Sequence, residues 1–307
     1  MTETASSAAL VPAAGEVFLD HVGLFMPEAQ ASPEAFIRLG FTLTPFARHG
    51  DAAGPGGARV PSGTGNRCAM FRQGYLELLA PTGEDTPLAR QLHQSLARHP
   101  GLHLIAFAVA DAEARHRQLP ARGLAPLPLV RLKRPVPTAV GEGIAGFDVV
   151  RLPPGIMAEG RVQMLTHATP DLVWQRRHLD HDNGARALTG ALVCVADAAE
   201  AANRFARFVD RPIAGRGGAF EVALHRGRVT LVEAEALARV LPGVTPPALP
   251  WIAAFGVAVA DPAVTERLLA AHNVTSRRLE PGRLHVAGAQ ALGAHLIFHA
   301  AEGGPWP

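Results

Sequence analysis

The chain has 307 residues and a formal net charge of +2 at pH 7, with 48% hydrophobic and 18% charged residues, so it is long enough for two domains and has no excess of basic charge for binding nucleic acid. Its only cysteines are Cys68 and Cys194, which excludes a disulfide framework or a cysteine-rich zinc site, and no apolar run approaches the roughly 18 residues of a membrane helix. We therefore expect a cytoplasmic protein with a small-molecule partner and no contact with membrane or nucleic acid, and the sequence leaves a homodimer open.

The first strand of the chain contains a histidine that needs an explanation. Residues 1–16 lack the basic and apolar regions of a secretory signal and predict a disordered lead-in. The next stretch, VFLDHVGLFM (17–26), predicts a strand that is apolar on both faces and therefore covered on both sides. His21 lies in the middle of this strand, and a buried imidazole requires a hydrogen-bond partner or a metal.

One pattern then recurs four times along the chain. An apolar strand ends in a short turn with an acidic residue, and an amphipathic helix follows, in residues 21–41, 104–124, 190–210 and 255–274. The acids fall at or near the helix start, where a carboxylate can cap free amides: Glu28, Asp111, Asp197 and Asp261. Short strands follow each helix, the last of them at 75–81, 161–170, 228–234 and 294–300. The repeat predicts an α+β fold of four βαβββ units, which must pair because one unit leaves a sheet face bare.

The repeat also predicts the domain boundaries. Residues 17–170 form a first pair of units, residues 171–186 a polar linker anchored by Trp174, and residues 187–307 a second pair. The glycine-rich stretch 54–66 predicts a loop that leads into a strand. A phosphate-binding loop is the weaker interpretation, because the stretch lacks the Gly-Lys-Ser/Thr ending and no strand directly precedes it.

Three segments carry a family resemblance: LDHVGLFMP, GTGNRCAMFRQGYLELLAP and TPDLVWQ…HDNGA. They resemble the vicinal oxygen chelate superfamily, which includes glyoxalase I, type I extradiol dioxygenases and bleomycin-resistance proteins, and within it a bacterial glyoxalase-like family. The resemblance extends from residue 17 to about residue 300. It implies that each pair of units forms an open barrel, with metal ligands on the first and last strands of each unit pointing inward.

Carried over residue by residue, the resemblance implies a metal site in the first pair. The ligand positions fall on His21, Glu77 and, less cleanly, His103, with Gln163 in the position that corresponds to Glu77. Counting back from the turn, Leu104 is the strict equivalent of His21, and only a bulge would turn His103 inward. The implied cofactor is a divalent metal such as Fe, Mn, Zn or Ni.

The same positions in the second pair hold no strong metal ligand, so we predict that residues 187–307 form a degenerate pair. The four positions hold Gly190, Thr230, Ala254 and, approximately, Leu296.

The remaining candidates are substrate-binding residues. Gln163 can donate a hydrogen bond to substrate, and His167 lies on the same nominal strand face. Asn66 follows the glycine-rich loop, and Arg131 or Arg134 in RLKR could hold a carboxylate. Each of these also has a plainer interpretation as a polar strand or loop residue.

Two functions remain open. The first is a metal-dependent enzyme, a lyase, isomerase or ring-cleaving dioxygenase, acting on a small molecule with two adjacent oxygens, with Glu77 as ligand or proton shuttle. The second is a metal-free protein that binds or sequesters a small molecule, as bleomycin-resistance proteins do. The displaced position of His103 and the neutral Gln163 favour the second function, whereas the pair His21 and Glu77 favours the first.

Overall fold

The fold consists of four βαβββ units, as the repeat predicted. The computed structural model describes residues 10–29, 33–52, 59–279 and 282–306. The first unit comprises β1 (Val17–Phe25), α1 (Pro33–Arg38), β2 (Ala47–Ala52), β3 (Arg59–Met70) and β4 (Tyr75–Pro81). The second comprises β5 (Gly101–Val109), α3 (Ala112–Gln118), η2 (Leu119–Arg122), β6 (Val130–Thr138), β7 (Gly141–Arg151) and β8 (Arg161–His167).

The third and fourth units repeat this order. The third comprises β9 (Ala185–Cys194), α5 (Ala198–Val209), β10 (Ile213–Arg216), β11 (Ala219–Ala223) and β12 (Arg228–Val232). The fourth comprises β13 (Trp251–Val259), α7 (Pro262–Ala271), β14 (Ser276–Leu279), β15 (Arg283–Val286), η4 (Gly288–Gln290) and β16 (His295–Ala300). The units are connected by α2 (Pro87–Arg98), α4 (Pro170–Val173), η3 (Arg176–His178) and α6 (Ala234–Val240).

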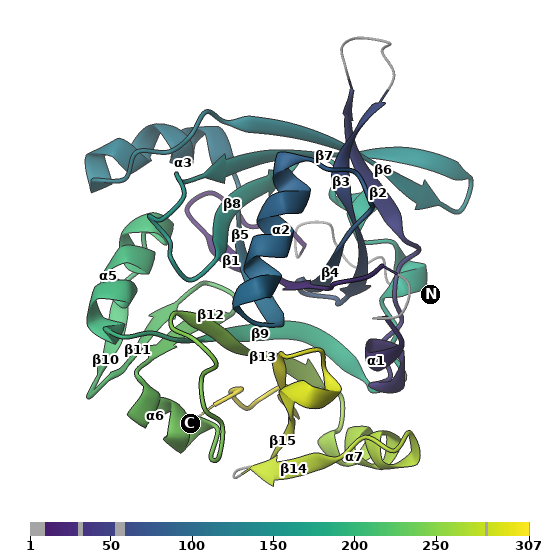
Figure 1. Cartoon of the computed structure of the whole chain (residues 1–307), viewed down its shortest axis with the longest axis vertical. Coiled ribbons are helices and arrows are strands. Elements are labelled where there is room, and N and C mark those ends of the chain that lie inside the picture. The colour runs from purple at the N-terminus through teal and green to yellow at the C-terminus, as the bar shows by residue number, and fades with distance from the viewer. Residues whose placement is uncertain (1–9, 30–32, 53–58, 280–281, 307) are drawn as a thin grey trace.

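Strand pairing groups the units two by two. In each unit the first strand lies parallel to the last, as β1 does to β4 and β9 to β12. The first strands of units one and two pair antiparallel, and so do those of units three and four. A short contact between Leu102 of β5 and Ile252 of β13 joins the two pairs into one sheet. The first pair occupies the upper part of Figure 1 and the second pair the lower part.

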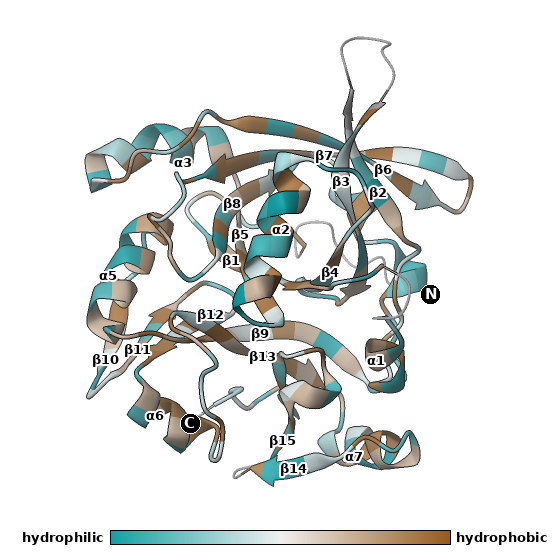
Figure 2. Ribbon diagram, in the orientation of Figure 1, coloured by the Kyte–Doolittle hydropathy of each residue, from teal (hydrophilic) through white to brown (hydrophobic). Residues whose placement is uncertain are grey.

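The helix starts follow the expected capping chemistry. Asp111, Asp197 and Asp261 are the N-caps of α3, α5 and α7, and each side chain accepts a hydrogen bond from a backbone amide of the first turn. Glu28 lies five residues before the start of α1 and does not cap it. Helix α2 is mostly hydrophilic (Figure 2), and only Ala89 and Leu92 of it are buried. No helix in the described ranges is both long and apolar enough to cross a membrane.

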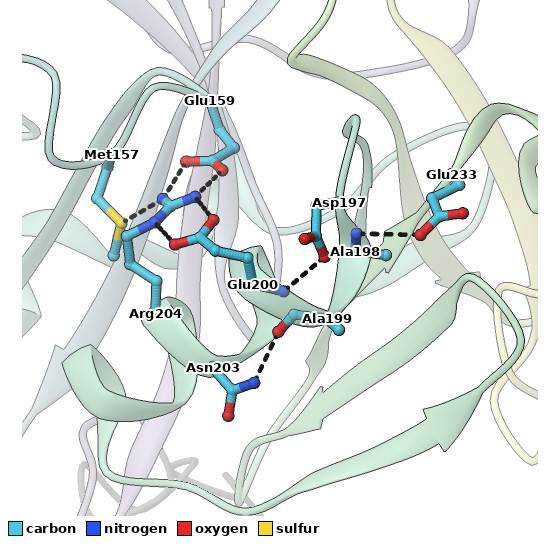
Figure 3. A network of polar contacts seen from close by, with 9 residues as sticks. All are labelled: Met157, Glu159, Asp197, Ala198, Ala199, Glu200, Asn203, Arg204 and Glu233. Atoms are coloured by element: carbon cyan, nitrogen blue, oxygen red, sulfur yellow. Dashed lines mark hydrogen bonds and ion pairs between the residues drawn. The ribbon is translucent and has the colours of Figure 1, made fainter.

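Side chains from both pairs share one hydrophobic core. Phe205 and Phe208 of α5 place their rings 6.4 and 6.3 Å from the ring of Phe107 on β5. Beside them, Arg204 of α5 donates two hydrogen bonds of 2.7 Å to the carboxylate of Glu159, in the loop before β8 (Figure 3). This contact ties the third unit to the second.

The glycine-rich stretch is more ordered than the sequence suggested. Strand β3 begins at Arg59, so residues 59–66, expected to be loop, pair with β2 on one side and, from Thr64 onward, with β4 on the other. Glycine permits this because a Cβ on Gly65 would lie 2.7 Å from the carbonyl oxygen of Ala47. Residues 53–58 lie outside the described residues. In the lead-in, residues 1–9 also lie outside them, whereas Leu10 packs against a cluster that contains Trp174.

Candidate functional site

A cavity of about 170 Å³ lies inside the first pair of units. Its wall combines strands β1 to β4 of the first unit with β5 to β8 of the second, and the segment around α4 and η3 lies across it. Four residues of one apolar cluster form its floor: Leu79, Leu104, Val149 and Leu165. A mostly apolar cavity with a few converging polar groups is the usual form of a small-molecule site.

Strand register brings the polar residues together. His21 on β1 lies opposite Ala106 on β5, and Ala106 lies opposite Gln163 on β8. The next inward-facing row runs from Glu77 through Gly23 and Leu104 to Arg161. Because alternate residues share a face, both rows point into the barrel. Ala106 and Gly23 are small, which leaves room between the polar groups at the two sides.

A β-bulge at Asp20 orients His21. Leu19 and His21 pair with consecutive residues of β5, so Asp20 is the extra residue, and its carboxylate is fully buried. Asp20 Oδ2 lies 2.7 Å from His21 Nδ1, and Oδ1 lies 2.8 Å from His167 Nε2.

The Asp20 carboxyl group is ionised. Burial alone would raise the pKa of Asp20, but the charges and hydrogen bonds of His167 and His21 outweigh it and hold this pKa well below its usual range. An ionised carboxylate only accepts hydrogen bonds, so both rings donate to it. In the neutral form of His21, Nε2 is then the acceptor, and it lies on the cavity side.

Glu77 faces His21 across the cavity wall. Its Oε2 lies 3.9 Å from His21 Nε2, and its Oε1 accepts a 2.7 Å hydrogen bond from Asn66 Nδ2. Burial raises the pKa of Glu77, but His21, His49 and Asn66 lower it by more, so that it lies below its usual value. Tyr75 stacks on the imidazole of His21 with ring centroids 4.4 Å apart. The site thus holds an ionised carboxylate next to an imidazole whose plane is fixed.

Three arginines line the same cavity: Arg134, Arg151 and Arg161. Burial, and next the charge of Arg151, lower the pKa of Arg161 to about 10, so its guanidinium remains charged at neutral pH. Its Nη2 donates to Gln91 Oε1 at 3.1 Å. Against these three cations, the lining that the described residues form contains one carboxylate, that of Glu77. The cavity is therefore electrostatically suited to an anion.

His49 of β2 supplies a test of this charge arrangement. Burial, and next the charge of Arg134, lower the pKa of His49 to about 4. Since the unfolded chain binds this proton near pH 6.5, the free energy of unfolding should fall by up to about 1.4 kcal/mol per pH unit as pH drops from 6.5 towards 4.

Imidazole NMR should show His49 titrating near pH 4 in the wild type and at higher pH in Arg134→Gln. Arg131→Gln, on the outer face of the same strand, should leave the midpoint unchanged. A midpoint for His49 near pH 6.5 in the wild type would contradict this geometry.

Five of the predicted residues meet in the cavity: His21, Glu77, Asn66, Arg134 and Gln163. Gln163 is 8% exposed, and its Oε1 is buried without a hydrogen-bond partner in the described part of the chain. An unsatisfied buried oxygen is costly, so this atom marks a place where a bound molecule or water can donate.

The structure does not bring His103, His167 and Arg131 into this cavity. His167 is hydrogen-bonded to Oδ1 of Asp20, the oxygen that does not contact His21, and its side chain is fully buried. Residues of β6 alternate between its two faces, so Arg134 points into the cavity and Arg131 points outward, towards Glu113 and Asp148. The arginine of RLKR that lines the cavity is therefore Arg134 rather than Arg131.

His103 occupies a bulge of its own. It is the extra residue between Leu102 and Leu104 where β5 pairs with β1, so it corresponds to Asp20, and Leu104 corresponds to His21. Its ring stacks on His99 at 4.2 Å, its Nε2 lies 2.9 Å from the carbonyl oxygen of His99, and it lines a separate cavity. The bulge exists, but it does not turn His103 towards Glu77.

These positions do not fit the implied metal. The set of His21, Glu77 and His103 is not assembled, and no group of three His, Cys, Asp or Glu side chains among the described residues could hold an ion. His21, Glu77 and the amide oxygen of Gln163 remain as donors, and a neutral amide is a weak anchor. Three neighbouring guanidinium groups oppose a divalent cation electrostatically. These residues therefore do not form the metal site that the resemblance implies.

Some of the cavity residues were not predicted from the sequence. Tyr75 and Arg161 lie two positions before Glu77 and Gln163, so alternation along a strand could have identified them. His49 and Arg151 lie on strands without clear alternation, and only the tertiary structure brings them to the cavity.

Comparison with known proteins is consistent with this fold. The sequence profile of a family described as "Glyoxalase-like domain" matches residues 19–209. None of the curated proteins matches the chain in sequence.

Three solved structures share the fold. A hypothetical protein from Staphylococcus aureus has a TM-score of 0.63 at 10% identity and covers 92% of this chain and 99% of its own. A variant of 4-hydroxymandelate synthase from Streptomyces coelicolor has a TM-score of 0.53 at 15% identity, covering 94% and 95%. A fusion of a xylose isomerase-like TIM barrel with a 4-hydroxyphenylpyruvate dioxygenase has a TM-score of 0.52 at 15% identity, covering 95% of this chain and 50% of its own. At these identities the likeness concerns the fold alone.

Proposed function

This chain belongs to the glyoxalase-like domain family, and we propose that its first pair of units binds a small carboxylate with a second oxygen next to the carboxyl group and moves a proton on it without a metal. The observation that carries the proposal is the convergence of three arginines with the Asp20–His21 pair on one apolar cavity. A 2-oxo or 2-hydroxy acid with an apolar body has the matching chemistry.

The arginines would hold the carboxylate. A guanidinium binds a carboxylate through charge-assisted hydrogen bonds, and low local dielectric strengthens such bonds. The apolar body would lie on the floor formed by Leu79, Leu104 and Leu165. Gln163 Oε1, which has no hydrogen-bond partner among the described residues, could accept a hydrogen bond from a hydroxyl group of the ligand.

His21 and Glu77 would perform the proton transfer. Asp20 keeps a proton on His21 Nδ1, so the free Nε2 can accept one from a carbon next to the carbonyl group. Glu77, ionised and 3.9 Å from that nitrogen, stabilises the imidazolium that forms. The developing enolate would be stabilised by the arginines. This is isomerase or lyase chemistry of the acid–base type.

Two other functions make different predictions. A sequestering protein would bind the ligand without exchanging its protons, and the apolar floor favours that alternative. A metal-dependent lyase or dioxygenase would require an ion bound through His21, as the resemblance implies. The dioxygenase half of one structural neighbour is named for 4-hydroxyphenylpyruvate, an aromatic 2-oxo acid, so this compound and phenylpyruvate are the first ligands to test.

Arg134→Gln should weaken binding of phenylpyruvate at least about 10-fold, since a hydrogen bond to a charged group contributes roughly 1.5–3 kcal/mol. The matched control is Arg131→Gln, which removes the same charge from the same strand on its outer face. Isothermal titration calorimetry measures both. Equal affinities of the two variants for phenylpyruvate would show that the arginines of the cavity do not bind its carboxylate.

Proton transfer is tested by hydrogen–deuterium exchange at C3 of phenylpyruvate, followed by NMR in D₂O. Exchange above the uncatalysed rate should be lost in His21→Ala and Glu77→Gln. Binding without exchange in the wild type would favour sequestration. Elemental analysis after dialysis against Fe, Mn, Zn or Ni tests the metal-dependent function. Near-stoichiometric metal in the wild type that is lost in His21→Ala would support that function and contradict our proposal.

A further inference from the structure

The second pair of units repeats the geometry of the first cavity with different residues. Its rows run from Gly190 through Gly256 to Ile297 and from Thr230 through Leu192 and Ala254 to His295. Gly190 thus takes the position of His21, and Thr230 that of Glu77. The second pair thus has glycine in place of the imidazole of His21 and a hydroxyl group in place of the carboxylate of Glu77, and a second glycine, Gly256, lies opposite Gly190.

The chain's own residues Pro305 and Trp306 fill this position. A Cβ built on Gly190 would lie 2.7 Å from Cζ2 of Trp306 and 3.1 Å from Cγ of Pro305. A Cβ on Gly256 would clash with Pro305 as well. Trp306 is 5% exposed, and its Nε1 donates a 2.8 Å hydrogen bond to Thr230 Oγ1. The indole ring therefore lies at the place that corresponds to the space between His21 and Glu77.

We propose that the second pair holds a small-molecule site for a planar aromatic ring with an N–H donor, and that Trp306 occupies this site in the present state as a tethered ligand. Indole is the simplest molecule of this class. The proposal is independent of the function proposed for the first pair.

The surroundings of Trp306 support a binding site. Apolar residues from β9, β12, β13, β16 and α6 with its C-cap form one cluster around it: Leu192, Cys194, Val232, Ala236, Leu237, Leu241, Trp251, Ala253, Ala254 and Ile297. Trp251 is 3% exposed, and its buried Nε1 has no hydrogen-bond partner among the described residues. Thr230 Oγ1 supplies an acceptor for an N–H group and the unpaired Trp251 supplies a donor, so the cluster can recognise more than an apolar shape.

The tether sets the affinity that an outside ligand will show. A segment attached by a few residues competes at an effective concentration in the millimolar range, so it lowers the apparent affinity of a free ligand of the same chemistry. Removing the indole of Trp306 should reveal the affinity of the empty site. Gly190 and Gly256 keep the space open, because any side chain at Gly190 would overlap the ring.

The experiment is titration of indole into Trp306→Ala and wild type by calorimetry, with circular dichroism to verify folding. Indole should bind Trp306→Ala at least about 10-fold more tightly than wild type. 1-Methylindole, which has no N–H donor, should bind the variant at least about 10-fold more weakly than indole, and this difference should disappear in Trp306→Ala/Thr230→Val. Failure of indole to bind the folded variant, or equal binding of both compounds, would overturn the proposal.

Gly190→Ala tests the same site with Trp306 retained. The added methyl group should displace the ring, so the amides of residues 301–306 should exchange with deuterium faster than in wild type, while indole, blocked by the same methyl group, should not bind more tightly. In the wild type, saturating indole should also raise exchange in residues 301–306. Exchange unchanged by the substitution and by indole would show that Trp306 is a fixed part of the core.

Discussion

Asp20→Ala is expected to lower the free energy of unfolding by about 3–5 kcal/mol and to abolish proton exchange on the ligand. Asp20 is fully buried and accepts hydrogen bonds from His21 and His167, so its removal leaves two buried N–H donors without a partner. His21 would also lose the bond that keeps Nε2 as the acceptor. Urea denaturation and the exchange assay measure the two losses.

The matched control for Asp20 is Asp180→Ala. Asp180 pairs with Arg72 at 3.2 Å, but its side chain is 87% exposed, so the change should stay within about 0.5 kcal/mol. The pH dependence provides a second check. Because the folded-state pKa of Asp20 lies below its ordinary value, its contribution is fully present above about pH 4 and is lost as pH falls further. A stability difference between wild type and Asp20→Ala that does not shrink below pH 4 would contradict the ionised carboxylate.

Arg204→Ala is expected to destabilise the protein by about 3–5 kcal/mol, because it leaves the carboxylate of Glu159 buried without its partner. The Glu159 side chain is 1% exposed, and Arg204 also donates to Glu200 at 2.9 Å. Figure 3 shows the guanidinium between the two carboxylates. Thermal and urea unfolding measure the effect.

Two further variants separate the charge from its packing. Arg204→Ala/Glu159→Gln removes the buried charge together with its partner and should be more stable than Arg204→Ala alone. Arg239→Ala breaks an exposed pair with Glu235 one helical turn away, and should cost less than about 0.5 kcal/mol. If Arg204→Ala were no more destabilising than Arg239→Ala, the pair would not stabilise the contact between the second and third units.

The ion pair of Arg204 with Glu159 lies next to the second cavity of the first pair. The loop that holds Glu159 contributes Met157 and Gly160 to that cavity, which His103 lines from β5. Arg151 and Arg161 line both cavities. Loss of this ion pair would therefore make the loop that holds Glu159 more mobile. This loop lies next to Arg151 and Arg161, which we propose bind the carboxylate.

Local chemistry in the sequence determined the units and their order. The apolar strands, the acids Asp111, Asp197 and Asp261 at the helix starts, and the recurrence of the pattern predicted four βαβββ units, because capping and alternation act over a few residues. The family resemblance identified His21 and Glu77 as a pair, and they stand on the first and last strands of one unit, which lie next to each other.

The tertiary structure alone decided which polar groups meet. The bulges at Asp20 and His103 depend on how β1 and β5 pair, and they place His21 in the cavity and His103 outside it. Arg134, Arg151 and Arg161 come from three successive strands of the second unit, and Trp306 fills the second pair more than 70 residues after Thr230. Such contacts depend on strand register and long-range packing, so patterns among neighbouring residues cannot predict them.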